Sequence, residues 1–116
     1  MIRVEVFYDE SVIKGFTIYG HANMASPGED LVCASVSALG QTALLGLDDY
    51  LDSKPRWRID DAGYLECWLP EDLTEDEFHA AQVIIHTMEL GLVAIGKTYG
   101  QYLKVSKRRW IKCCSK

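Results

Sequence analysis

The chain has 116 residues and a mass of 13.1 kDa, which fits a single domain able to bury roughly two-thirds of its unfolded surface. Hydrophobic residues make up 48% and charged residues 25%, a balance that excludes an intrinsically disordered chain. The net charge of -5 is unevenly spread: residues 1–96 hold 5 basic and 17 acidic residues, and residues 97–116 hold 7 basic and no acidic residues. The acidic body favours a basic protein partner over nucleic acid, whereas the basic end is the one feature that favours contact with RNA.

The sequence also predicts a cytoplasmic location. The longest apolar run, residues 90–96, is too short to cross a bilayer, and the first residues open a strand-like alternation rather than a signal peptide. We therefore expect no membrane association. The four cysteines contain no CxxC pair and no zinc-finger spacing, so we expect free thiols in a reducing compartment.

Two strands are expected at the start of the chain. Residues 2–8 alternate apolar and polar side chains, the period of a half-buried strand. After a turn at residues 9–11, residues 13–20 supply the β-branched and aromatic side chains typical of a second strand. This strand ends at Gly20, so the hairpin delivers His21 to the edge of the sheet.

A short polar loop containing Pro27 and Gly28 follows, and then a helix. Asp30 is a plausible N-cap, and the helix is expected to run to about residue 51. Its apolar stripe is Val32, Val36, Leu39, Ala43, Leu47 and Leu51, while Cys33 and Ser37 lie one turn apart on another face. Small residues in the first half of the helix allow another backbone to come close.

The second half repeats the pattern. Strands are expected at residues 56–60 and 64–69 around a turn at 61–63, followed by a helix that opens with a capping box at Thr74 and Glu77 and ends at Gly100. A last strand covers residues 102–106, and residues 107–116 form a basic C-terminal tail. The order β-β-α-β-β-α-β predicts an α+β fold of two layers, with a mostly antiparallel or mixed sheet and two helices on one face.

The segment between Gly20 and Leu39 carries the strongest chemical signal. A cysteine in the first turn of a helix lies near unpaired backbone N–H groups and the positive end of the helix dipole, which stabilise a thiolate. The loop can fold back so that the imidazole of His21 meets the thiol of Cys33. Such a pair would be a cysteine nucleophile with its general base.

These residues resemble the ribosomal-processing cysteine protease family, Prp. The resemblance rests on Gly20-His21-Ala22, Gly28, the run from Asp30 to Ala34, and the run from Val36 to Leu39, and continues in the second helix and last strand with Gly91-Leu92, Ala94-Ile95, Tyr99, Tyr102-Leu103 and Val105. Asn23 departs from the family, which usually has glycine after His-Ala. The basic residues after Val105 have no counterpart in it.

The resemblance implies a cysteine endopeptidase domain over residues 1–106 that removes a short N-terminal extension from a basic ribosomal protein of the large subunit. Cys33 would attack the scissile carbonyl and His21 would act as general acid and base. Family members look like homodimers. No cofactor is implied, and no metal site either, because His79 and His86 lie seven residues apart rather than four.

Several residues keep a second interpretation. Cys33 could be a small buried apolar residue, and His21 a strand-end histidine bonded to backbone. Asp30 could cap the helix or orient His21, and Ser37 could donate a hydrogen bond into the cleft or to a backbone carbonyl. The glycines at positions 20 and 28 could be plain turn residues or hinges.

Two other functions remain open at this stage. One is a binding module for ribosomal protein or RNA in which Cys33 is inert. The other is a thiol enzyme of different chemistry, such as acyl transfer.

Overall fold

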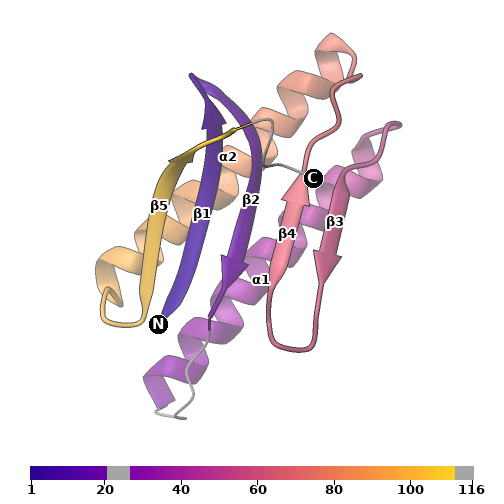
Figure 1. Cartoon of the computed structure of the whole chain (residues 1–116). Helices are drawn as coiled ribbons and strands as arrows, with labels where there is room; N and C mark the ends of the chain where they lie inside the picture. The colour runs from indigo at the N-terminus through magenta and orange to yellow at the C-terminus, as the bar shows by residue number, and fades with distance from the viewer. Residues whose placement is uncertain (21–26, 112–116) are drawn as a thin grey trace.

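In the computed structural model, one mixed sheet is covered on a single face by two long helices (Figure 1). The structure describes residues 1–20 and 27–111, with side chains described at 1–20 and 31–111. The elements follow the expected order: β1 (Ile2–Asp9), β2 (Val12–Tyr19), α1 (Pro27–Tyr50), β3 (Arg56–Ile59), β4 (Leu65–Trp68), α2 (Glu75–Thr98) and β5 (Leu103–Arg109). The predicted two-layer α+β fold is therefore confirmed.

The sheet has the strand order β3-β4-β2-β1-β5. Three of its pairings are antiparallel, and the pairing of β5 with β1 is parallel. The long connection through α2 brings the chain back to the end of the sheet where β1 starts, so β5 runs in the same direction as β1. The β1–β2 register shifts between Phe7 and Tyr8, where Lys14 is the extra residue in β2. Such a bulge bends the strand and re-aims the inserted side chain.

The core lies between the sheet and the helices. Alternate residues of β1 and β2, including Val4, Val6 and Phe16, are fully buried, as the period of two predicts. The stripe expected in the first helix contributes Val32, Val36, Leu47 and Leu51 to the same core. Gly40 brings α1 close to the sheet, since a Cβ at this position would lie 2.6 Å from the Ile18 Cδ1 atom. The neighbour is a side chain, so the approach of another backbone to the small residues of this helix stays a prediction.

The start of α2 is fixed by the predicted capping box. Thr74 accepts a hydrogen bond from the Glu77 backbone N–H, and the Glu77 carboxylate accepts one from the Thr74 N–H at 3.0 Å. Glu77 also accepts the N–H of Asp52, just after α1, at 2.7 Å. These bonds lower the pKa of the Glu77 carboxyl, with the two backbone donors as the main cause. One carboxylate therefore joins the start of α2 to the end of α1.

Three differences from the expected boundaries affect the interpretation of particular residues, and the other boundaries agree to within one residue. The helix α1 begins at Pro27, so Pro27 and Gly28 belong to its first turn rather than to a loop, and Asp30 is its fourth residue rather than its N-cap. Pro is favoured at the first helical position because its missing N–H has no partner there. The α2 helix ends at Thr98 with Tyr99 as its C-cap. The strand β5 continues to Arg109, so the first three residues of the expected tail belong to the sheet.

By length and composition alone, residues 31–50 and 75–98 are apolar enough to cross a membrane, a test that core helices of soluble proteins also pass. Here one stripe of each helix packs against the sheet. The outward stripes are also apolar: Leu31, Leu45, Val83 and Leu90 are each at least half exposed. The single chain therefore presents an uncovered apolar surface on the side of the helices away from the sheet.

Candidate active site

Cys33 lies on α1 and lines a cavity of about 290 Å³ at the end of the sheet where β1 begins and β2 ends. Its side chain is partly exposed. One wall consists of Val36 and Ser37 of the same helix, and a second of Ile2, Ile18 and Gly20 of the sheet. Cys33 packs against the hydrophobic core but is only partly buried, and its remaining surface lines a cavity that can hold part of a ligand.

The position of Cys33 in the helix differs from the prediction. Because α1 begins at Pro27, Cys33 is its seventh residue and lies in the second turn. The N–H groups without a helical acceptor are those of the first four residues, so the N–H of Cys33 is directed to the carbonyl of residue 29. In this conformation the thiol is one turn further from the positive end of the helix than the sequence suggested.

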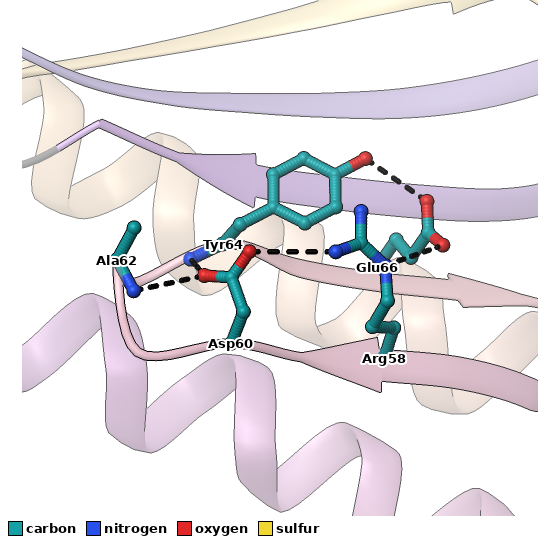
Figure 2. A network of polar contacts seen from close by, with 5 residues as sticks. All are labelled: Arg58, Asp60, Ala62, Tyr64 and Glu66. Carbon is teal, nitrogen blue, oxygen red and sulfur yellow. Dashed lines mark hydrogen bonds and ion pairs between the residues drawn. The ribbon is translucent and has the colours of Figure 1, made fainter.

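A third wall of the cavity comes from the turn between β3 and β4, formed by Asp61, Ala62 and Gly63. Figure 2 shows how Asp60 shapes this turn: its Oδ1 atom accepts the N–H of Ala62 at 3.0 Å and the N–H of Tyr64 at 3.1 Å. Its backbone carbonyl also accepts the N–H of Gly63, which has a φ of 88°. The positive φ favours glycine, and the Asp side chain substitutes for a backbone acceptor.

The sequence predicts a hairpin turn in this segment but does not connect the turn with the site. A signal was present, because an Asx turn requires Asp or Asn at its first position and the turn carries Asp60 and Gly63 at suitable spacing. What sequence could not supply is the sheet order, which places the end of the β3–β4 hairpin beside Cys33.

Gly20 closes β2 with a φ of 84°, and a Cβ at this position would lie 2.5 Å from the carbonyl oxygen of Met1. Glycine is therefore required twice, by the backbone angle and by the close approach of the first strand. The predicted role of Gly20 as a hinge remains a prediction. The structure shows its place directly after β2, packed against the backbone of Met1.

The structure describes three of the four remaining predicted site residues. His21 lies outside the described residues, so its distance from Cys33 stays a prediction. Gly28 and Asp30 are placed by backbone alone, in the first turn of α1, and the N-cap interpretation of Asp30 is wrong for this reason. Ser37 is exposed one turn beyond Cys33 and lines the same cavity, in agreement with the predicted shared face.

The second cysteine of the described chain behaves differently. Cys67 lies on β4 and is fully buried in the core. Burial raises the pKa of its thiol to about 12, because the apolar surroundings disfavour the thiolate. Between the two described thiols, Cys33 is therefore the one accessible to a substrate.

A small α+β domain with a partly exposed cysteine in a cavity at one end of the sheet defines a candidate thiol-dependent enzyme. Its family follows from comparison with known proteins. The family model described as cysteine protease Prp matches residues 1–104, and the chain belongs to this family of cysteine proteases. The resemblance noted from the sequence is thus confirmed, and so is the assignment as a protease.

Curated relatives support the same assignment. The chain is 32% identical over 105 residues to the ribosomal processing cysteine protease Prp of Bacillus subtilis (strain 168), covering 85% of this chain and 88% of that protein. It is 30% identical over 110 residues to the protein of the same name from Staphylococcus aureus (strain Mu50 / ATCC 700699), covering 91% and 98%.

Solved structures share the fold. SMU.848 from Streptococcus mutans superposes with a TM-score of 0.82 at 21% identity, covering 95% of this chain and 96% of that one. The essential ribosomal processing protease Prp from S. aureus, in complex with a covalently linked product peptide, gives a TM-score of 0.77 at 27% identity, covering 93% and 100%. A covalently held product peptide in that relative is consistent with a protease that works through a covalent intermediate.

Proposed function

We propose that this protease removes an N-terminal extension from a ribosomal protein precursor, with Cys33 as the nucleophile and His21 as the general acid and base. The observation that carries the proposal is the accessible thiol of Cys33 in a cavity, inside the region that matches the protease family. The names of the Bacillus and Staphylococcus relatives, both ribosomal processing proteases, support the choice of substrate.

The proposed reaction has two steps. His21 takes the proton of the Cys33 thiol, the thiolate attacks the scissile carbonyl carbon, and the imidazolium gives that proton to the leaving amine as the C–N bond breaks. The thioester formed at Cys33 is then attacked by water, whose proton passes to His21. The C–S bond breaks, the imidazolium returns that proton to the sulfur, and the carboxylic product is released. Ser37 and Asp30 support the site in this proposal, Ser37 by a hydrogen bond into the cavity and Asp30 from the first turn of α1.

Four described backbone N–H groups near the cavity already have acceptors and cannot donate to an oxyanion in this conformation. The N–H groups of Ala62, Gly63 and Tyr64 are already bonded to Asp60, and the N–H of Cys33 lies inside α1. We infer that the turn of α1 before Cys33 opens when substrate binds. This opening would free the Cys33 N–H for the oxyanion and place the thiol at the true start of the helix.

The charge distribution suits the proposed substrate. The chain carries a net charge of -5, and ribosomal proteins are the kind of basic partner that an acidic body attracts by long-range steering. The free thiols of Cys33 and Cys67 suit the reducing cytoplasm, which we propose as the location.

The test is incubation of the ribosomal precursor with the wild type and with Cys33→Ala, followed by mass spectrometry of the products. We expect one new N-terminus with the wild type and none with Cys33→Ala. Cys67→Ala is the matched control, since it removes a thiol outside the cavity and should still cleave. Cleavage of the precursor by Cys33→Ala would refute the assignment. A precursor that stays intact after incubation with the folded wild type would refute it as well.

We also propose that two copies of the chain associate through the outer sides of α1 and α2. The supporting observation is the apolar surface there, which includes a hollow of about 360 Å³ lined by residues such as Leu39, Val83 and Met88. The stretch of α1 from Leu31 to Leu47 contains no charged residue, although its exposed positions face away from the sheet. Apolar surfaces of this kind mark interaction sites.

Sedimentation equilibrium tests this association. The wild type should sediment with twice the mass of one chain, and Leu45→Glu should sediment as a monomer because it introduces a charge at a position that is 69% exposed. Leu45→Gln is a milder control that keeps the size and adds no charge. A monomeric wild type at micromolar concentration would exclude the proposal.

A further inference from the structure

The sheet face that the helices leave uncovered carries the opposite charge from the chain as a whole. We call it the open face: it consists of the side chains that alternate with the buried ones along each strand, such as the paired Arg3 and Tyr19. Its basic side chains outnumber its acidic ones two to one. They are Arg3, Lys14, Arg56, Arg58, Lys104 and Arg108, against Glu5, Asp9 and Glu66.

Several of these basic groups are available to a ligand. Glu5 pairs with Arg108, and Glu66 pairs with Arg58 at 3.4 Å. Arg3, Arg56 and Lys104 are exposed and have no carboxylate within 4.0 Å among the residues that the structure describes. A net positive surface therefore exists on a chain of net charge -5. Such a surface attracts polyanions.

Aromatic rings lie among these charges. Gly15 and Trp68 are paired across β2 and β4, and a Cβ at Gly15 would collide with the Trp68 ring, so the indole lies directly over the glycine backbone. Phe7 is the partner of Gly15 on the other side, and its ring centroid lies 5.1 Å from that of Trp68. The glycine thus lets two rings from different strands meet on the surface of the sheet.

A hollow of about 320 Å³ lies beside this pair, where β2 and β3 begin and β4 ends. Trp68 and Trp110 line it, together with Lys14 and Arg56, and Glu71 is its acidic member. The bulged residue Lys14 holds its Nζ atom 4.9 Å from the centre of the Trp110 ring. Trp110 is held in place by a hydrogen bond from its backbone N–H to the carbonyl of Tyr8 at 2.9 Å.

A second aromatic group lies further along the face. The rings of Tyr19 and Tyr64 are 6.3 Å apart, and the Arg58 guanidinium lies 4.7 Å from the Tyr64 ring centre. Figure 2 shows this guanidinium beside the Tyr64 ring, between the carboxylates of Asp60 and Glu66. Two aromatic groups separated along one basic surface provide stacking positions for more than one flat ring.

We propose that the open face binds single-stranded nucleic acid, with one base inserted between Trp68 and Trp110 and the adjoining phosphates on Lys14 and Arg56. Base stacking on aromatic side chains, combined with a basic surface along the backbone, is how sheets bind single strands without reading sequence. Duplexes are disfavoured, since their bases are already stacked. An acidic peptide could use the charges but not the aromatic rings.

The hollow proposed to hold the base shares no lining residue with the Cys33 cavity. Cys33 lies on α1, which covers the other face of the sheet (Figure 1). The inference therefore does not depend on the proposed proteolytic function, and Cys33→Ala should bind nucleic acid as the wild type does.

Fluorescence anisotropy with a labelled oligouridylate of about twelve nucleotides tests the proposal. We expect micromolar affinity at low salt and a log–log salt slope of roughly -2 to -3, corresponding to three or four phosphates. Trp110→Ala should weaken binding about five- to a hundredfold through loss of one stacked base, and Trp110→Phe should restore most of the affinity. Intrinsic tryptophan fluorescence should fall on binding in the wild type.

Charge variants separate phosphate contact from bulk electrostatics. Arg56→Gln should reduce the magnitude of the salt slope by about 0.7, whereas Lys97→Gln, an exposed charge on α2, should leave it unchanged. Oligothymidylate of equal length distinguishes the sources: equal binding assigns the site to single strands in general, and weaker binding assigns it to RNA.

Three results would overturn the proposal. They are no anisotropy change at low salt, binding of poly-glutamate or a duplex as tight as that of the single strand, and an unchanged affinity in Trp110→Ala.

Discussion

Cys33 and Gly63 line one cavity, although thirty residues of sequence separate them. The sheet order explains the contact: β4 pairs with β2, so the hairpin that joins β3 and β4 ends beside the start of β1 and the cysteine-bearing helix. Cys33, the proposed nucleophile, therefore lies on a long helix, and the wall opposite it is the turn from Asp60 to Gly63. Such a division leaves the turn as the part of the site that can change specificity without changing the fold.

Replacement of the two described cysteines should separate catalysis from packing. Cys33→Ala should lower turnover about a thousandfold or more and change the free energy of unfolding by less than about 1 kcal/mol, because the side chain is partly exposed. Cys67→Ala should cost about 1 to 2 kcal/mol by leaving a small void in the core, with turnover retained. Peptide cleavage and urea unfolding measure the two effects, and a fully active Cys33→Ala would contradict the assignment.

Asp60 should determine substrate affinity through the shape of the turn. Asp60→Ala removes the acceptor of the Ala62 and Tyr64 N–H groups, so we expect KM for a peptide substrate to rise several-fold, with a smaller change in kcat. Asp60→Asn is the matched variant, because it keeps the Oδ1 acceptor and loses only the charge towards Arg58, which is 3.4 Å away and exposed. Steady-state kinetics of both variants decide the point. Equal behaviour of the two would assign the effect to charge instead of turn geometry.

Much of this fold follows from local pattern. Alternation in β1 and the 3.6-residue stripe of α2 predict their elements, because each buries one face against the same core. The start of α1 could not be predicted, since Asp30 and Pro27 are both acceptable helix starts and the choice depends on the surrounding structure. The end of β5 was missed because Lys107, Arg108 and Arg109 have low strand propensity, and their place in the sheet comes from pairing with β1.

The sequence predicts the site from Cys33 and from the residues spaced around it on the same helix. Cys33 and Ser37 share a helix face by spacing alone, so their common cavity was predictable. The contribution of Asp60 and Gly63 depends on sheet order, which no spacing reveals. The aromatic and basic open face was missed for the same reason, because its members come from all five strands.

Cys67 should make stability depend on alkaline pH. Its pKa rises from an ordinary value of 9.0 to about 12 on folding, so above pH 9 the unfolded chain loses a proton that the folded chain retains. The free energy of unfolding should therefore fall between pH 9 and 12 by about 1 kcal/mol per pH unit from this group alone. Tyr64, whose pKa burial and the Glu66 hydrogen bond raise to about 12, adds to the loss. The difference between wild type and Cys67→Ala in urea titrations isolates the cysteine contribution; parallel pH profiles would refute it.

Gly20 should be the glycine least tolerant of substitution near the site. Gly20→Ala places a side chain at a φ of 84° and a Cβ 2.5 Å from the Met1 carbonyl, so we expect a loss of about 1 to 3 kcal/mol and a Tm lower by several degrees. Because His21 follows directly, kcat/KM should fall even at temperatures where the variant is fully folded. Gly96→Ala is the control, since a Cβ there makes ordinary contacts of 3.7 Å or more within α2 and should leave activity unchanged with equal or higher Tm. Differential scanning calorimetry and peptide cleavage at low temperature measure both quantities. A Gly20→Ala enzyme that melts later than wild type would show that the chain leaves β2 in another direction, and one that melts earlier but keeps full activity would show that His21 does not depend on that direction.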